Sequence, residues 1–565
     1  MFTWITSRLK PGEKNPEHPL ATEADIGAWL AEQPVFNAQR TLQALDEWLG
    51  DPEHLAAQLD PGQMARAIGR LDEFAQTALA QCWLELWQEA GKERQVALPT
   101  RPLETYYQHS FASNLLVVQR LALDPALGQD KKQLTRFALR AMHAWVQLKK
   151  LARMTYRPSA EHWWSQAHEI VRSARTLGIL NLEQRLYPNS DAGSSVWYEY
   201  LAGLMLETLP LSNLSTNEIE VADRLVRWVV TRVHYTETAT DFSLFAIDPE
   251  GNQGPFRIQP DKPVPSQLRC LSPGTGYQQI SQLRATLVTR QEVPPWLESA
   301  GLLREQLQAL LQTIVAHWSN PAPSRRQPRT AVSGKVQVVN GLALVRRMIA
   351  ASEFARSGRS LDYEGYIKSM QHRHKGHDAI VKDIPPPPKT PMEVLQLLET
   401  AGDRQMMDQW EIIDASKDGM GVRCFARRHW HAIDAIVAWR RPDDLDWRVG
   451  IIRRLGSSHG VPNAGLTTFG GTPYCSQVRV SRAEDQGNLW TQQTQETSGK
   501  GWRDAVLLSF EERLLLAPPG TYGADLRIDV SIRGRFRPAR VVALEAKGSD
   551  YELIRFQEAG DTRTD

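Results

Sequence analysis

The sequence predicts a multidomain α+β protein, in which an α-helical N-terminal array is followed by a β-sandwich or barrel with a helical insertion. Three observations carry this prediction. Over roughly the first 320 of the 565 residues, apolar side chains recur at intervals of three and four, the period of an amphipathic helix. After about residue 325 the period falls to two, which is typical of strands. A helical pattern interrupts these strands from about 346 to 407.

The composition is that of a soluble globular protein, with 42% hydrophobic and 23% charged residues. The formal charge of +1 gives no bulk attraction to nucleic acid or to a membrane surface. The four cysteines form no C-x-x-C pair, which argues against a zinc ribbon and fits a reducing compartment. With no apolar run of a signal peptide or of a membrane helix, we expect a cytoplasmic protein.

Residues 1–237 predict an α-helical domain. The helical period is clearest in four stretches, 24–33, 42–50, 74–90 and 133–152. No repeat of fixed length is present, so a solenoid is not predicted. We expect this domain to act as an interaction or output module that binds a protein partner.

Residues 238–319 predict a mixed region, with a hairpin around the turn DPEGNQG and a helical stretch over 294–318. A linker, NPAPSRRQPRT, leads into the third domain, residues 320–565. Its many short apolar runs predict strands, among them KVQVVNGLALV at 335–345. The insertion at about 346–407 carries Pro385–Pro388, a tract that predicts a stiff polyproline II spacer.

Two short motifs in this third domain stand out together. The linker carries R-x-x-x-R at Arg325 and Arg329, immediately before the first strand. A later strand, in IIDASKDGMGVR, ends in D-x-S-x-x-G at Asp414, Ser416 and Gly419. Each motif alone arises readily by chance. Their presence in one β domain is more informative.

This pair of motifs resembles the signature of PilZ domains, small β-barrels that bind the bacterial second messenger cyclic di-GMP. The strand WRVGIIRRL, residues 447–455, also resembles a late strand of such barrels. The resemblance implies a PilZ-like antiparallel β-barrel within 320–565, and a ligand site made by Arg325, Arg326, Arg329, Asp414, Ser416 and Gly419. Unlike the family pattern, in which the motifs lie a few tens of residues apart, Arg329 and Asp414 are 85 residues apart here.

The residue types suit this ligand. Arginine offers planar, bidentate donors for phosphate oxygens and for the O6/N7 edge of guanine. A carboxylate accepts from the N1–H and N2–H₂ of guanine, serine adds an adaptable hydroxyl, and glycine lets the backbone come close to the base. Arginines on a linker can fold over the ligand and change the angle between domains.

By resemblance, the protein is expected to be a cyclic di-GMP receptor that regulates motility, adhesion or exopolysaccharide through its helical module. No catalytic set is present, so we predict neither an enzyme nor a cofactor besides this ligand. The one nucleophile-like motif, GSSHG at 456–460, has neither a following helix nor a later histidine.

Three readings of the β domain and its insertion compete with ligand binding. One is a scaffold protein whose barrel has lost its ligand. Another is a binder of single-stranded nucleic acid. The recurring arginine pairs favour this alternative, and the near-neutral charge of the chain argues against it. The cluster His372, His374 and His377 suggests a metal site, but without Cys or acidic partners at ligand spacing we interpret it as a solvated basic patch.

Overall fold

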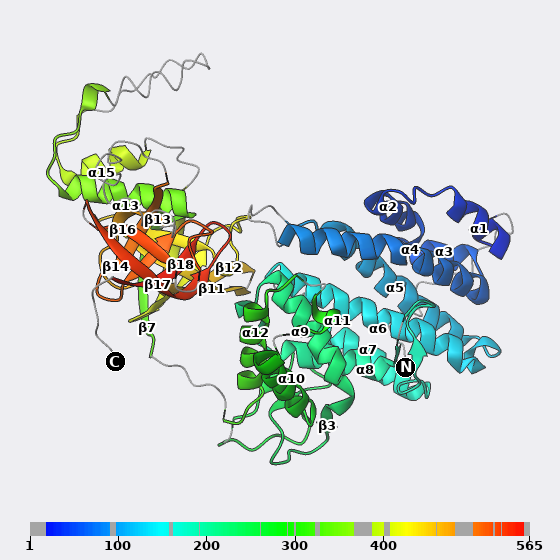
Figure 1. Cartoon of the computed structure of the whole chain (residues 1–565). Coiled ribbons are helices and arrows are strands. Elements are labelled where there is room, and N and C mark those ends of the chain that lie inside the picture. The colour runs from blue at the N-terminus through cyan, green and yellow to red at the C-terminus, as the bar shows by residue number, and fades with distance from the viewer. Residues whose placement is uncertain are drawn as a thin grey trace. The chain divides into compact units, whose positions relative to one another are not determined.

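The computed structural model describes residues 18–90, 98–157, 162–190, 192–259, 261–290, 292–298, 301–321, 328–365, 387–400, 407–458, 460–480, 501–523, 526–532 and 534–558. It divides into two compact units (Figure 1). The helical unit holds the described residues up to 321, and the barrel unit holds those from 328 on. The predicted fold class is confirmed, because a helical array is followed by an antiparallel β-barrel with a helical insertion.

All four stretches with the clearest helical period are helical. The helices of this array are α1 (Glu23–Ala31), α2 (Ala38–Leu49), α3 (Pro52–Gln58), α4 (Pro61–Ala90), α5 (Arg101–Leu123), α6 (Lys131–Met154), α7 (Trp163–Thr176), α8 (Val196–Glu207) and α9 (Thr216–Val229). Capping boxes begin two of them: Thr22 with Asp25 at α1, and Ser215 with Glu218 at α9. The long helices α4, α5 and α6 pack side by side around one hydrophobic core.

The mixed region belongs to the same compact unit. It contains a four-stranded sheet in the order β3-β6-β4-β5, formed by β3 (His234–Thr236), β4 (Phe245–Ile247), β5 (Phe256–Arg257) and β6 (Arg269–Ser272). The predicted hairpin is confirmed, since β4 and β5 pair antiparallel around the expected turn. The described residues of the unit also form a separate strand pair and three further α-helices: β1 (Gln184–Arg185), β2 (Gly193–Ser194), α10 (Gly276–Arg290), α11 (Pro295–Glu298) and α12 (Arg304–His317).

The barrel unit begins with a closed barrel of strand order β10-β11-β12-β9-β8-β7. Its strands are β7 (Thr330–Asn340), β8 (Asp408–Ser416), β9 (Gly419–Cys424), β10 (Ile436–Arg440), β11 (Arg448–Ser458) and β12 (Val461–Thr468). The predicted insertion leaves this barrel between β7 and β8, and carries α13 (Leu342–Arg356) and α15 (Pro391–Thr400). The histidine cluster and the start of the proline tract lie outside the described residues.

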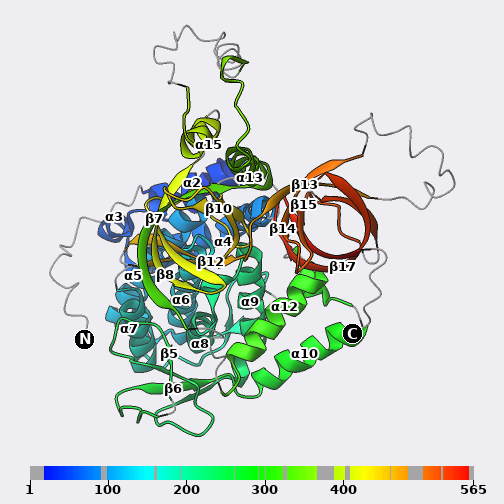
Figure 2. The ribbon, with the colours of Figure 1, turned by 90° about the vertical axis from the view of Figure 1, so that its left-hand side faces the viewer.

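The remaining strands form a second closed barrel, which the sequence had not separated from the first. Its order is β13-β14-β15-β18-β17-β16, and Figure 2 shows it end-on as a ring. Its strands are β13 (Tyr474–Val480), β14 (Arg503–Ser509), β15 (Leu514–Ala517), β16 (Arg527–Ile532), β17 (Arg535–Lys547) and β18 (Glu552–Glu558). The expectation of one barrel is therefore extended to two within this unit.

Helix α13 packs between the two barrels. Its buried Val345, Met348 and Ile349 share one core with side chains of both. The backbone N–H of Leu342 donates to Asp550 Oδ2 of the second barrel at 2.6 Å, so a distant carboxylate caps the helix. The strand predicted over 335–345 was therefore wrong at its end, because the helix begins at Leu342.

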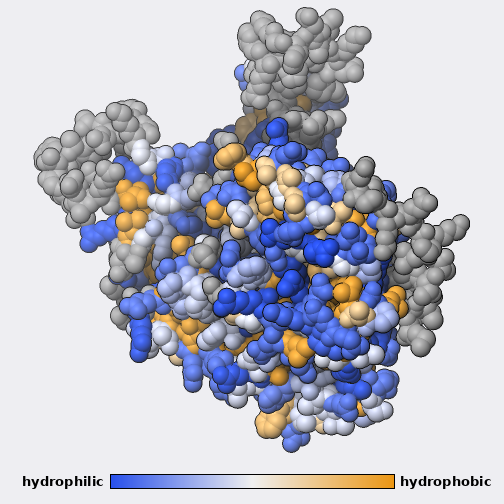
Figure 3. Space-filling view, turned by 90° about the vertical axis from the view of Figure 1, so that its right-hand side faces the viewer, coloured by the Kyte–Doolittle hydropathy of each residue, from blue (hydrophilic) through white to orange (hydrophobic). Residues whose placement is uncertain are grey.

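Hydrophobic side chains on the face seen in Figure 3 lie in small groups among hydrophilic ones. Such scattering is ordinary for a protein surface. None of the helices in the described part of the chain combines the length and the hydrophobicity needed to cross a lipid bilayer.

Candidate functional site

The β8–β9 hairpin positions the D-x-S-x-x-G residues. Ser416 ends β8 and pairs with Gly419, the first residue of β9, so only Lys417 and Asp418 form the connection. Ser416 Oγ also donates to the Gly419 carbonyl, at 3.4 Å. The motif is thus a tight hairpin end on the first barrel.

A β-bulge in β8 decides which way the motif faces. Upstream of it, Trp410 and Ile412 are buried in the barrel. Alternation alone would point Asp414 inward as well, because it lies two residues after Ile412. The register shifts by one residue between Ile412 and Asp414, however, which leaves Ile413 as the extra residue. As a result Asp414 and Ser416 lie on the outer face of the barrel.

The two predicted motifs meet at this outer face. Arg329 immediately precedes β7, whose Ala331 pairs with Asp414. Arg329 Nη1 donates to Asp414 Oδ1 at 2.6 Å, and both side chains remain about three-tenths exposed. The insertion is an excursion from the barrel, and it does not keep the motifs apart. Arg325 and Arg326 lie outside the described residues.

Two glycines on β9, Gly419 and Gly421, leave room on the outer face for the ion pair of Arg329 and Asp414. A Cβ on Gly421 would lie 2.6 Å from Asp414 Oδ1 and 3.2 Å from Arg329 Nη1, so the ion pair rests directly on Gly421. A Cβ on Gly419 would lie 3.1 Å from the carbonyl oxygen of Leu466. Gly419 is not in the left-handed region, so its lack of a side chain matters more than its conformational freedom.

Sequence reasoning missed Gly421. The signal was available, because Gly419 and Gly421 are two residues apart on one strand and therefore share a face. What the sequence could not show is that the carboxylate lies across that face. The arrangement as a whole offers a carboxylate acceptor, a guanidinium donor and bare backbone, which can bind a ligand that carries both hydrogen-bond donors and anionic or acceptor groups.

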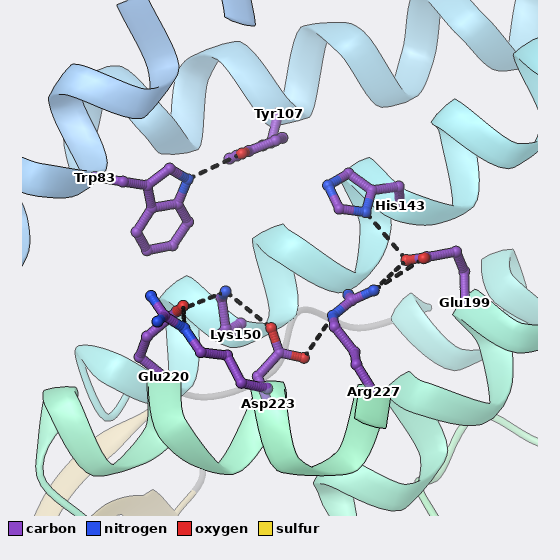
Figure 4. Close-up of polar contacts among 9 residues, drawn as sticks. Trp83, Tyr107, His143, Lys150, Glu199, Glu220, Asp223 and Arg227 are labelled. Carbon is purple, nitrogen blue, oxygen red and sulfur yellow. Dashed lines mark hydrogen bonds and ion pairs between the residues drawn. The ribbon is translucent and has the colours of Figure 1, made fainter. Parts of the chain in front are cut away.

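The helical unit holds a second cluster of polar side chains, in the buried contacts of α6, α8 and α9 (Figure 4). Lys150 Nζ donates to Glu220 at 2.8 Å and to Asp223 at 2.9 Å. Arg227 donates through Nε to Asp223 at 3.0 Å, and through Nη1 to Glu199 at 2.9 Å. These contacts link three helices through paired charges.

Aromatic and histidine side chains border this network. Trp83 Nε1 donates to the Tyr107 hydroxyl at 3.0 Å, and Lys150 Nζ lies 4.5 Å from the centre of the Trp83 ring. His143 Nδ1 lies 3.0 Å from Glu199 Oε2. Burial would raise the pKa of Glu199, but Arg227 and His143 outweigh it and hold that pKa well below its usual range. Because its charges compensate one another, we interpret the network as a link between helices.

Among the described residues, no group of three or more His, Cys, Asp or Glu side chains is arranged to hold a metal ion. The four cysteines are free thiols. Burial raises the pKa of Cys82 to about 11 and the pKa values of Cys424 and Cys475 to about 12, so these three thiols are poor nucleophiles at neutral pH.

Part of the helical unit is similar to a known protein family. Residues 24–239 match the family described as "Cyclic-di-GMP receptor FimW, N-terminal domain". The matched segment runs from α1 to just beyond β3. The chain has no match among the curated proteins and none among the solved structures. The helical half is therefore similar to the N-terminal domain of a cyclic-di-GMP receptor.

Proposed function

We propose that the protein is a receptor for cyclic di-GMP, and that the outer face of the first barrel binds the nucleotide in the manner of a PilZ domain. The observation that carries this proposal is the contact of Arg329 with Asp414 above Gly421, which unites two motifs 85 residues apart. The similarity of residues 24–239 to the N-terminal domain of a cyclic-di-GMP receptor supports it independently.

In this proposal Asp414 accepts hydrogen bonds from the N1–H and N2–H₂ of a guanine. Arg329, already held beside Asp414, donates to a phosphate oxygen or to the O6/N7 edge of a base. Arg325 and Arg326, at the start of the same motif, add further donors. Ser416 supplies a hydroxyl at the rim, and Gly419 and Gly421 let the base approach the backbone.

The protein would act as a regulator and not as an enzyme. Ligand binding would change the population of conformations by as much as its affinity for them differs. We propose that the helical unit passes this change to a protein partner, and that the outcome is control of motility, adhesion or exopolysaccharide in the bacterial cytoplasm.

Calorimetric titration of the full chain with cyclic di-GMP tests the proposal. Replacing Arg329 or Asp414 by Ala removes charge-assisted hydrogen bonds worth about 1.5–3 kcal/mol each, so affinity should fall roughly 10- to 100-fold. Arg537→Ala is the matched control, because Arg537 forms a comparable surface pair with Glu558 at 2.8 Å in the second barrel. It should bind as the wild type does.

Wild-type affinity in Arg329→Ala would overturn the assignment of the site. No binding by the wild-type chain would favour a scaffold whose barrel has lost its ligand. Tight binding of an oligonucleotide that weakens steeply with salt would favour a nucleic-acid binder instead.

A further inference from the structure

The outer face of the first barrel carries a row of four residues in cross-strand register. Asp414 on β8 pairs with Gly421 on β9, Gly421 pairs with Gly465 on β12, and Gly465 pairs with Arg454 on β11. Residues paired in this way share one face of the sheet. The row thus has a carboxylate residue at one end, a guanidinium residue at the other, and two residues without side chains between them.

The two glycines form a floor that the end residues cover. A Cβ on Gly465 would lie 3.2 Å from Arg454 Cβ and 3.3 Å from Arg454 Nε, so the Arg454 side chain lies along Gly465. On the other side, the Asp414 carboxylate lies over Gly421. The two charged groups therefore approach each other across neighbouring strands.

A second β-bulge turns Arg454 to the outer face of the barrel, as the first bulge does for Asp414. Ile452 is fully buried in the barrel, and Arg454 two residues later would face inward by simple alternation. The register between β11 and β12 shifts between Ile452 and Arg454, and this turns Arg454 to the outer face. A one-residue β-bulge thus orients the residue at each end of the row.

Two neighbouring arginines form ion pairs with acidic side chains. Arg453, the extra residue of the bulge, pairs with Asp434. Arg423, on the same strand as Gly421, pairs with Glu411 at 2.9 Å. Two arginines therefore lie over the glycine floor: Arg454 lies along Gly465, and Arg329 lies over Gly421 beside Asp414.

We propose that Arg454 is a further arginine of the nucleotide site and reads the O6/N7 edge of the guanine that Asp414 holds by its N1–H and N2–H₂. This inference rests on the proposed function. The N1–H/N2–H₂ edge and the O6/N7 edge of guanine are adjacent, so a carboxylate and a guanidinium that lie over neighbouring strands can bind both edges of one base. Arginine paired with guanine O6 and N7 is a common specific contact, and it would exclude adenine, which presents an amino group in place of O6.

The test is a titration of full-length Arg454→Ala with cyclic di-GMP and with its 7-deazaguanine analogue, which lacks the N7 acceptor. Affinity for cyclic di-GMP should fall roughly 5- to 100-fold. The analogue should bind more weakly than cyclic di-GMP to the wild type, and this penalty should disappear in Arg454→Ala. Arg448→Ala, on the same strand six residues away, is the control and should behave as the wild type.

Two results would overturn this inference and leave the proposed function standing. One is wild-type affinity for cyclic di-GMP in Arg454→Ala. The other is an unchanged difference in affinity between cyclic di-GMP and the 7-deazaguanine analogue in that variant, which would mean that Arg454 contacts a phosphate. Arg454→Lys, which keeps the charge without the planar fork, should lose this difference also. Circular dichroism and the thermal midpoint of each variant separate a binding defect from misfolding. Failure of the wild type to bind cyclic di-GMP would instead reject the proposed function itself.

Discussion

Single residues place the candidate site, and two of them are the extra residues of β-bulges. Ile413 and Arg453 each shift the register by one, so that Asp414 and Arg454 face outward. The two motifs named Arg329 and Asp414 as candidate site residues, and these two side chains are in contact. The motif spacing could not predict their direction, because alternation from the buried Ile412 would have turned Asp414 into the core.

Gly421→Ala tests whether the floor beneath the ion pair matters. The new Cβ would stand 2.6 Å from Asp414 Oδ1, so the carboxylate and Arg329 must move. We expect the affinity for cyclic di-GMP to fall roughly tenfold, about 1.4 kcal/mol, with the barrel still folded. Calorimetry measures the change.

Gly470→Ala is the control for this variant, because a Cβ there meets nothing within 4 Å. Equal affinity of Gly421→Ala and Gly470→Ala would show that the space over Gly421 plays no part in binding.

We expect His168 to make the stability of the helical unit sensitive to acid. It is buried against Trp164 and lies 3.0 Å from the Tyr200 hydroxyl, and burial lowers its pKa from 6.5 to about 4. The unfolded chain therefore takes up the proton first, and stability falls as the pH drops from 6.5 toward 4. His168→Asn, which does not titrate, should remove up to about 3 kcal/mol of this loss.

Thermal denaturation of the full chain, followed by far-UV circular dichroism across that pH window, measures the effect. The wild type should lose stability more steeply than His168→Asn. Parallel losses in the two proteins would mean that other groups account for the acid sensitivity.

At the scale of elements, the helical insertion was predictable and its attachment was not. A break in the strand pattern marked the insertion. Glu399 of α15 attaches the insertion to the first barrel. Its carboxylate accepts hydrogen bonds from Arg440 Nε and Nη2 at 2.7 Å each and from Trp447 Nε1 at 2.8 Å. All three side chains are buried. Contacts between residues 41 and 48 positions apart leave no local pattern in a single sequence.

Glu399→Gln should therefore destabilise the barrel unit. It leaves the buried Arg440 guanidinium without its counter-charge, which costs about 3–5 kcal/mol. Urea denaturation measures the loss. Glu411→Gln, whose partner Arg423 is about half exposed, should cost less than about 1 kcal/mol. Similar costs for the two variants would contradict the anchoring role of Glu399.

For the whole molecule, the period of the apolar residues changes near residue 325, and the described residues of the two compact units divide between 321 and 328. The division of the strands into two barrels was not predictable, because the alternation of apolar and polar residues identifies a strand but not the strand with which it pairs. The same limit explains the error over 335–345. The chain turns at Gly341, at φ +83°, into a helix whose first N–H is capped by Asp550, more than 200 residues away.

The two units have separate cores, so a ligand of the first barrel should stabilise only the barrel unit. At a concentration a hundred times its Kd, cyclic di-GMP should add about 2.7 kcal/mol. That should raise the melting temperature of the barrel unit by roughly 5–10 °C and leave the helical transition unchanged. Calorimetric scanning together with far-UV circular dichroism distinguishes the two transitions. A shift of the helical transition would place the ligand in the helical unit instead.

The central claim is that cyclic di-GMP binds where Arg329 and Asp414 meet. Titration of the wild-type chain and of Asp414→Ala with cyclic di-GMP, side by side in one calorimeter, tests it most directly. The account predicts saturable binding by the wild type, and affinity lower by roughly 10- to 100-fold in the variant, with unchanged folding. Equal affinity in the two proteins would contradict it.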